Sequence, residues 1–346
     1  MNVFNGERYL PEALASVCAQ TLSDWELLIV DDGSTDRTVA IAEEWAGRDE
    51  RMRVVRLPHA GAVQARNRAL ELARAPLAAL WDQDDLASPE RLGLQLDFLA
   101  RNPDVGVLGT WAWHIGESGR RVGVSEFGPL TREAFRALQA AGEPMFAVAS
   151  SVVFSVEAAR AAGGFSVEMA EATDVDLWTR MADHTVMLIL PRRLVEYRIH
   201  AASASTRRFF RQMEALELIK VNARRRRASR PQLTLAQWQE AVAARPRAER
   251  LRRARVWRSR LYYRTGAGLL AAGRPSGVAY LAAAAALDPA TVAARLRRQV
   301  GPIAEAFVRR CGRGTISAPP MRPQAPVRPR SPGSSSERRR RRTRAR

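Results

Sequence analysis

The chain has 346 residues, of which 46% are hydrophobic, and a formal net charge of +19. This length allows one large domain or two, and the apolar content is ample for a buried core. The two cysteines, Cys18 and Cys311, lie far apart, which excludes a disulfide framework or a zinc finger. No apolar run approaches the roughly 18 residues of a membrane span. The start MNVFNGERYL lacks a signal-peptide pattern, so we expect a cytoplasmic protein.

Helices and strands alternate in the first third of the predicted structure. Helices are expected over 7–20, 38–48, 59–75 and 88–103, and strands over 27–30, 52–57, 76–82 and 105–113. In the last of these helices, Ser88 is the expected N-cap, followed by Pro89 in the first turn. Strands that alternate with helices of this length are typical of parallel βαβ units, so we predict an open α/β sheet to about residue 115.

The rest of the chain changes character twice. Residues 145–200 have a mixed α and β pattern, and from residue 207 the sequence is helical and rich in arginine, with a small-residue helical hairpin at 262–289. Residues 312–346 are rich in Pro, Ser and Arg and are expected to be disordered. We therefore predict three parts, with boundaries near residues 206 and 311.

Charge follows the same division. Residues 1–206 contain 20 arginines and 29 acidic residues, whereas residues 207–346 contain 35 basic and 7 acidic residues. Lys220 is the only lysine, so a GC-rich coding sequence would explain part of the arginine excess. The basic part suggests either peripheral contact with an anionic membrane at the inner face of the plasma membrane or a plain solubilising appendage. Nucleic acid is not an expected partner, because no recognition motif accompanies the charge.

Two acidic turns follow predicted strands. Asp31 and Asp32 come directly after LLIV, and Asp82, Asp84 and Asp85 come after PLAALW. Ligands of open α/β sheets bind beyond the carboxyl ends of the strands, so both turns are expected at one edge. Carboxylates there suit a divalent cation and a hydroxyl-rich ligand. The alternative for the second turn is a solvated acidic loop.

Several motifs in order resemble the inverting glycosyltransferases of family 2. They are FNGERYLPEALASVCAQTLSDWELLIVDDGSTDRT, AGAVQARNRALELA, LWDQDDLASPERL, GGF, TDVDLWTRMA and YRIHAASAS, and they extend over about residues 1–206. The resemblance implies the GT-A fold, in which helices flank a Rossmann-like, mixed and mostly parallel sheet. It also implies transfer of a sugar from a nucleoside-diphosphate sugar to a hydroxyl acceptor, saccharide or lipid-linked, in the synthesis of a cell-envelope polysaccharide or glycolipid.

The resemblance assigns the nucleotide to the first acidic turn and the chain start. Asp31 and Asp32 match the family's site for the base and ribose, and Phe4 and Asn5 match its aromatic-Asn pair beside the base. Glu7 is counted with this nucleotide-sugar group. A carboxylate accepts hydrogen bonds from ribose hydroxyls or from a base N–H, so the residue type fits. The alternative is a turn in which Asp32, Ser34 or Asp36 caps the next helix.

The second group of residues is assigned to the donor's phosphates and a Mg²⁺ or Mn²⁺ ion. WDQDD matches the family's DxD motif, with Asp84 as the metal ligand and Asp82 on the ribose or the metal. Arg66 and Asn67 match the ARN motif and are expected to contact the nucleotide, although Arg66 fits a helix-surface ion pair equally well. Of the four histidines, only His200 lies in a motif, where it is expected near the metal or diphosphate or in a purely structural role.

The catalytic base is assigned to Asp174 in TDVDLW. The family usually has Glu where this chain has Thr173, and Asp174 then matches the residue that takes the acceptor's proton. Trp178 and Arg180 follow on the same helix, where core packing and a structural ion pair explain them better.

The chain departs from the family at its start, where most of the first strand is absent and Asn2 stands in place of proline. We expect the natural start to lie further upstream. A truncated, inactive scaffold and an Arg-rich protein that binds nucleic acid or an anionic surface are therefore the alternatives to an active transferase.

Overall fold

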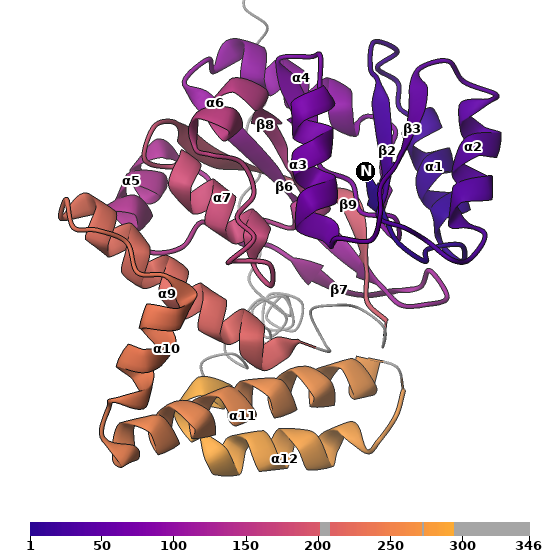
Figure 1. Cartoon of the computed structure of the whole chain (residues 1–346). Helices are drawn as coiled ribbons and strands as arrows, with labels where there is room; N and C mark the ends of the chain where they lie inside the picture. Colours follow the sequence, from indigo (N-terminus) through magenta and orange to yellow (C-terminus); the bar gives the residue numbers. More distant parts are fainter. Residues whose placement is uncertain (201–207, 272, 294–346) are drawn as a thin grey trace, which may run out of the picture. The chain divides into compact units, whose positions relative to one another are not determined.

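A parallel sheet forms the first part of the fold (Figure 1). The computed structural model describes residues 1–200, 208–271 and 273–293. The parallel strands are β1 (Asn2–Val3), β2 (Leu27–Asp31) and β3 (Met52–Arg56), with β2 in the middle. β1 is two residues long. A parallel bridge between Asn2 and Asp82 connects it to a second sheet.

β2 is buried on both faces, which explains its unbroken apolar sequence. Leu27 and Ile29 join the main core with the helices α1 (Leu10–Cys18) and α2 (Thr38–Ala46). Leu28 and Val30 point the other way and pack against Ala65 of α3 (Ala62–Leu72). Helices therefore cover both sides of this sheet, and the ends of its strands are left for a ligand.

The second sheet is mixed. Its order is β4 (Leu77–Ala79), β8 (Val153–Ser155), β6 (Val105–Ile115), β9 (Val186–Arg198) and β5 (Leu86–Ala87), with β7 (Arg121–Ser125) paired to β6. β6 and β9 run parallel, whereas the other described pairs are antiparallel. The predicted α/β class is confirmed, but parallel pairing does not dominate this sheet. One reason is local, because a tight turn with Gly119 at φ +77° folds β7 back on β6 as a hairpin.

The helix after the second acidic turn begins later than predicted. α4 spans Arg91–Arg101, and Ser88 does not cap it, so the predicted N-cap is wrong. The Ser88 N–H instead donates to Leu194 O at 2.9 Å and extends the pairing of β5 with β9. The Gln20 side chain satisfies the helix start, since its carbonyl accepts from Leu92 N–H at 3.1 Å.

The remaining helices complete the described chain. They are α5 (Arg132–Ala140), α6 (Val156–Ala161), α7 (Thr173–Met181), α9 (Phe209–Arg227), α10 (Leu235–Ala243), α11 (Arg247–Ala271) and α12 (Gly277–Leu287), with a 3₁₀ turn at Ala149–Ser151. Val175 of α7 shares an apolar cluster with Leu218 of α9 and Trp238 of α10. The predicted hairpin is present, because α11 and α12 pack together and the Ser259 hydroxyl donates to Ala284 O at 2.8 Å. Both predicted boundaries, near 206 and 311, and the predicted disordered tail lie outside the described residues.

Among the described residues, every helix is too short or too polar to span a bilayer.

Candidate active site

The acidic turn DQDD lies just beyond β4, where the two sheets meet. Asp82 forms the bridge with Asn2, and its backbone N–H donates to Ser150 Oγ at 3.1 Å. The Ser150 hydroxyl donates in turn to Asp85 Oδ2 at 2.5 Å. A single buried serine therefore fixes both ends of the acidic turn.

Asp85 is the structural member of the acidic cluster. Its side chain is buried, and Oδ1 accepts from the Arg198 N–H at 2.8 Å. Burial raises the pKa of Asp85 well above its usual value, and the neighbouring charges of Asp84 and Asp82 raise it further. The mutual repulsion of the three carboxylates is thus reduced by favouring the neutral form of the buried one.

Asp84 and His200, the two side chains predicted near the metal, lie next to each other. His200 Nε2 lies 2.8 Å from Asp84 Oδ2, and both side chains are largely buried. Arg198 holds the backbone here, because its Nε donates to Asp84 O at 2.9 Å. The same buried guanidinium donates to Glu12 Oε2 at 2.6 Å and lies over the Tyr9 ring. Residues 116 positions apart in the sequence are therefore brought into contact.

The Asp84 and His200 side chains would suit a cation that is also coordinated by a phosphate. Among the described residues, no group of three or more His, Cys, Asp or Glu side chains could hold a metal by itself. Mg²⁺ in nucleotide sites usually takes one or two carboxylates and completes its shell with phosphate oxygens and water. Asp84 and His200 fit this kind of site, because a carboxylate oxygen and a ring nitrogen that could coordinate a cation lie side by side where the two sheets meet.

Arg66 links the acidic turn to the first strand. From α3 it donates to Asp82 Oδ1 at 3.0 Å and to Asn2 Oδ1 at 3.1 Å. The Arg66 side chain is only 14% exposed. Arg66 thus forms an ion pair, as the alternative has it, but the pair is largely buried and its carboxylate belongs to the DxD motif.

Asn67 anchors the GGF segment instead of pointing at open space. Its amide donates to Phe165 O at 2.9 Å and accepts from Phe165 N–H at 2.8 Å. Gly164 approaches so closely that an added Cβ would lie 2.8 Å from Asn67 Oδ1, and its φ of +67° also favours glycine. Asn67 was predicted to contact the nucleotide, but both the N–H₂ and the oxygen of its side-chain amide bind the GGF loop and position it.

Asp174 lies in the first turn of α7, close enough to Arg66 and Asp82 to interact with both charges. Burial is the main effect and raises its pKa. The positive charge of Arg66 opposes this shift, whereas the negative charge of Asp82 adds to it. The predicted base is therefore brought to the same place as the predicted donor site.

The rest of α7 is structural. Asp176 pairs with Arg180 at 2.7 Å, and Arg180 donates to Gly164 O at 2.6 Å, which ties α7 to the GGF loop. Trp178 is fully buried, in agreement with the core role predicted for it. Thr173, which stands where the family usually has Glu, is also buried, and its hydroxyl has no hydrogen-bond partner among the residues that the structure describes.

The first acidic turn is held by its own backbone. Asp31 accepts from the N–H groups of Gly33 and Ser34, both at 3.1 Å, and is buried. Asp32 is also buried and accepts from Ala60 N–H at 2.8 Å, which joins the ends of β2 and β3. None of the proposed caps holds the N-cap position of α2, which belongs to Arg37, but Asp36 just before it accepts from Thr38 N–H at 2.9 Å through its Oδ1.

Phe4 lies at the same edge, with 39% of the residue exposed. Its ring stacks on His59 with centroids 4.4 Å apart. The Gln83 side chain holds the Phe4 backbone at both N–H and C=O, at 2.9 and 3.1 Å. Asn5 adopts φ +45°, and its Oδ1 accepts from Thr35 N–H at 2.9 Å.

Glu7 belongs to the same network, because its Oε2 accepts from Arg37 N–H at 3.0 Å. Five of the predicted nucleotide residues, Phe4, Asn5, Glu7, Asp31 and Asp32, thus lie together at the ends of the parallel strands.

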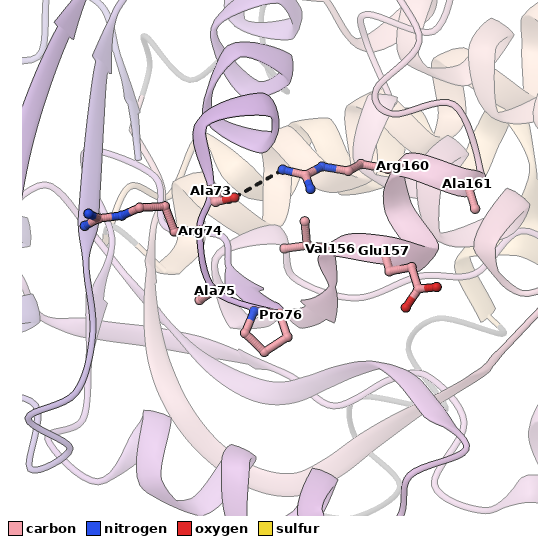
Figure 2. A pocket seen from close by; sticks show the side chains of 8 residues that line it. All are labelled: Ala73, Arg74, Ala75, Pro76, Val156, Glu157, Arg160 and Ala161. Carbon is pink, nitrogen blue, oxygen red and sulfur yellow. Dashed lines mark hydrogen bonds between the residues drawn. The ribbon is translucent and has the colours of Figure 1, made fainter.

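Two surface hollows of the described residues lie away from these side chains. Figure 2 shows one of about 500 Å³ between the end of α3 and the start of α6. Arg160 reaches back to Ala73 O at 3.1 Å and to Leu70 O at 2.7 Å, so it caps the C-terminal end of α3. We therefore interpret this hollow as a consequence of helix capping, because it lacks the predicted site residues.

Four residues that support the site were given no role in the sequence analysis. Gln83 holds the backbone of Phe4, and Ser150 binds the acidic turn. Arg198 binds the backbone of the same turn, and His59 stacks on Phe4. Gln83 lies inside the DxD motif and Arg198 lies two residues before His200, so their positions within motifs were a signal that could have identified both. Ser150 and His59 become significant only through contacts distant in sequence.

Comparison with known proteins finds a family resemblance in the N-terminal part of the chain. The model of the family "Glycosyl transferase family 2" matches residues 1–162. An uncharacterized glycosyltransferase of Methanocaldococcus jannaschii is 27% identical over 202 residues, which cover 56% of this chain and 67% of that protein. The uncharacterized glycosyltransferase EpsJ of Bacillus subtilis is 40% identical over 86 residues, which cover 25% of each protein. This chain therefore spans less than two thirds of the length of EpsJ.

A solved structure supports the same fold. The mannosyltransferase PcManGT from Pyrobaculum calidifontis, in complex with GDP-Man and Mn²⁺, superposes with a TM-score of 0.53 at 20% identity and covers 90% of this chain and 86% of that one. Residues 1–162 of this chain are thus similar to glycosyl transferase family 2, and its fold is of the GT-A type.

Proposed function

We propose that this chain is an inverting glycosyltransferase that uses a nucleoside-diphosphate sugar and a divalent cation. The observation that carries the proposal is the convergence of Asp82, Arg66 and Asp174. Arg66 binds Asp82 directly, and both charges act on Asp174. The proposed donor-binding turn and a half-buried candidate base thus lie close together.

The donor is proposed to extend from the first acidic turn to the second. Its base and ribose would lie near Phe4, Asn5 and Asp31 at the ends of the parallel strands, and its diphosphate near Asp84 and His200. A cation bound there would neutralise charge on the departing diphosphate. Arg66 could exchange part of its contact with Asp82 for a phosphate of the donor, because guanidinium forms strong, often bidentate hydrogen bonds with both carboxylate and phosphate.

Asp174 is proposed to be the base of a single displacement. Its carboxylate takes the proton of the acceptor hydroxyl while that oxygen bonds to the anomeric carbon. The bond from this carbon to the diphosphate oxygen breaks on the opposite face, and the nucleoside diphosphate leaves with the bonding electrons. Burial raises the pKa of Asp174, which makes its carboxylate a better proton acceptor.

Calorimetric titration of the chain with UDP, with and without Mn²⁺, tests the donor site. We expect binding that requires the metal and that Asp84→Asn weakens at least about ten-fold, since one charged ligand is lost. Asp97→Asn, a change at an exposed carboxylate on α4, is the matched control. Equal binding with and without Mn²⁺, or by Asp84→Asn, would refute the assignment of the metal.

The acceptor is proposed to be a saccharide or a lipid-linked sugar near an anionic membrane surface. Several arginines of α9 are engaged within the protein, as Arg226 is with Asp183 at 2.6 Å. On α11, by contrast, the exposed residues Arg247, Arg250, Arg255 and Arg258 recur at helical spacing. Such a basic face gains free energy near anionic lipid.

A further inference from the structure

His59 has an orientation that its sequence context does not predict. It follows β3, as Phe4 follows β1 and Asp32 follows β2, so parallel pairing brings all three to one edge. The His59 ring is nearly parallel to that of Phe4, at an angle of 21°. Its side chain is 59% exposed, which leaves one ring edge open to a ligand.

Asp32 determines which ring nitrogen of His59 carries the proton. Nδ1 lies 2.9 Å from the backbone oxygen of Asp32 and 3.0 Å from its Oδ2. Both atoms are acceptors, so Nδ1 must be the donor. In the neutral ring, Nε2 is then left with a lone pair and accepts a hydrogen bond.

Asp32 is itself rigidly placed, which makes the tautomer a fixed feature. It is 3% exposed, and its carboxylate accepts from Ala60 and Gly61 N–H groups at 2.8 and 3.0 Å. Those residues directly follow His59, so one carboxylate holds both the loop and the ring. Gly33 lies against the same loop, because an added Cβ would come within 2.8 Å of the His59 N–H nitrogen.

We propose that His59 selects the nucleobase of the donor, an inference that rests on the proposed function. A base stacked on Phe4 would present its hydrogen-bonding edge to His59 Nε2. Uracil, thymine and guanine carry a ring N–H on that edge, whereas cytosine and adenine carry a lone pair there. The acceptor at Nε2 therefore favours uridine, thymidine and guanosine diphosphate sugars and disfavours cytidine diphosphate sugars.

Titration of the full chain with UDP and CDP at pH 8 with Mn²⁺ tests this selection. We expect UDP to bind about ten-fold more tightly than CDP, because two facing lone pairs leave both acceptors unsatisfied. His59→Phe keeps an aromatic ring on Phe4 but removes the acceptor, so the ratio should fall to about one. His184→Phe, at an exposed histidine elsewhere, should keep the ratio.

A chemical probe tests the same point without a variant. UDP methylated at N3 lacks the donor, and we expect it to bind the unmodified chain as weakly as CDP. Equal binding of UDP and CDP, full binding of the methylated probe, or a preference that survives in His59→Phe would each overturn the inference while leaving the transferase site intact. Failure of both nucleotides to bind with Mn²⁺ would instead refute the proposed function and this inference with it.

Discussion

Replacement of Ser150 by alanine should disturb both the stability of the fold and the donor site. The hydroxyl accepts from Asp82 N–H at 3.1 Å and donates to Asp85 Oδ2 at 2.5 Å, and the residue is 1% exposed. Ser150→Ala leaves a buried N–H and a buried carboxyl group without this partner. From the usual values for orphaned groups, we expect a loss of about 2–4 kcal/mol in the free energy of unfolding.

The effect on binding follows from the position of Asp84 between those two anchors. A loosened turn no longer holds Asp84 against His200, so Mn²⁺-dependent UDP affinity should fall about 10–100-fold, as for other residues that support metal ligands. Urea denaturation measures the stability, and calorimetry measures the affinity below the unfolding transition.

Ser151 provides the matched control. It is equally buried. Its hydroxyl accepts from Thr110 N–H at 3.2 Å and donates to Val148 O at 2.7 Å, and neither of these hydrogen bonds involves the acidic turn. Ser151→Ala should lose about 1–3 kcal/mol of stability while its folded fraction keeps the UDP affinity. If Ser151→Ala weakens UDP binding as much as Ser150→Ala does, the proposed support of Asp84 by Ser150 is wrong.

Two further predictions concern the chemical step and the basic part of the chain. Asp174→Asn should lower kcat by about 10²–10⁴-fold with little change in UDP affinity, because general-base assistance is lost. In the unmodified enzyme, kcat should fall on acidification through a pKa above the ordinary aspartate value of about 3.9, since burial raises the pKa of Asp174. Arg66→Gln should move this fall of kcat to higher pH, because the Arg66 charge lowers the pKa of Asp174. If the pH at which kcat falls is unchanged, Asp174 is not the base. The full chain should float with phosphatidylserine vesicles but not with neutral ones, and Arg250→Glu with Arg258→Glu should reduce flotation more than a double reversal at exposed Arg68 and Arg101.

Local pattern alone predicted most elements of the first 115 residues, because each has a strong period. The apolar LLIV stretch became a strand buried on both faces, and the helix of the ARN motif became α3. Ser88 shows the limit of such signals. A serine before a proline is a good local cap, yet pairing with Leu194, which is far away in the sequence, outweighs that preference.

The sequence by itself determined which residues could carry the chemistry. The order of the DDGSTD, ARN, WDQDD and TDVDLW motifs indicated the family, and the residue types suited a donor, a cation and a base. Spacing along the chain, however, cannot say which carboxylates face a ligand and which are buried supports.

Only the tertiary structure decided those roles, because they depend on contacts between distant segments. Asp85 is a buried support since Ser150 and Arg198 approach it, whereas Asp84 meets His200. In the same way, His59 has no motif, and it becomes a candidate for base selection only because parallel strands bring Phe4 and Asp32 to its two sides.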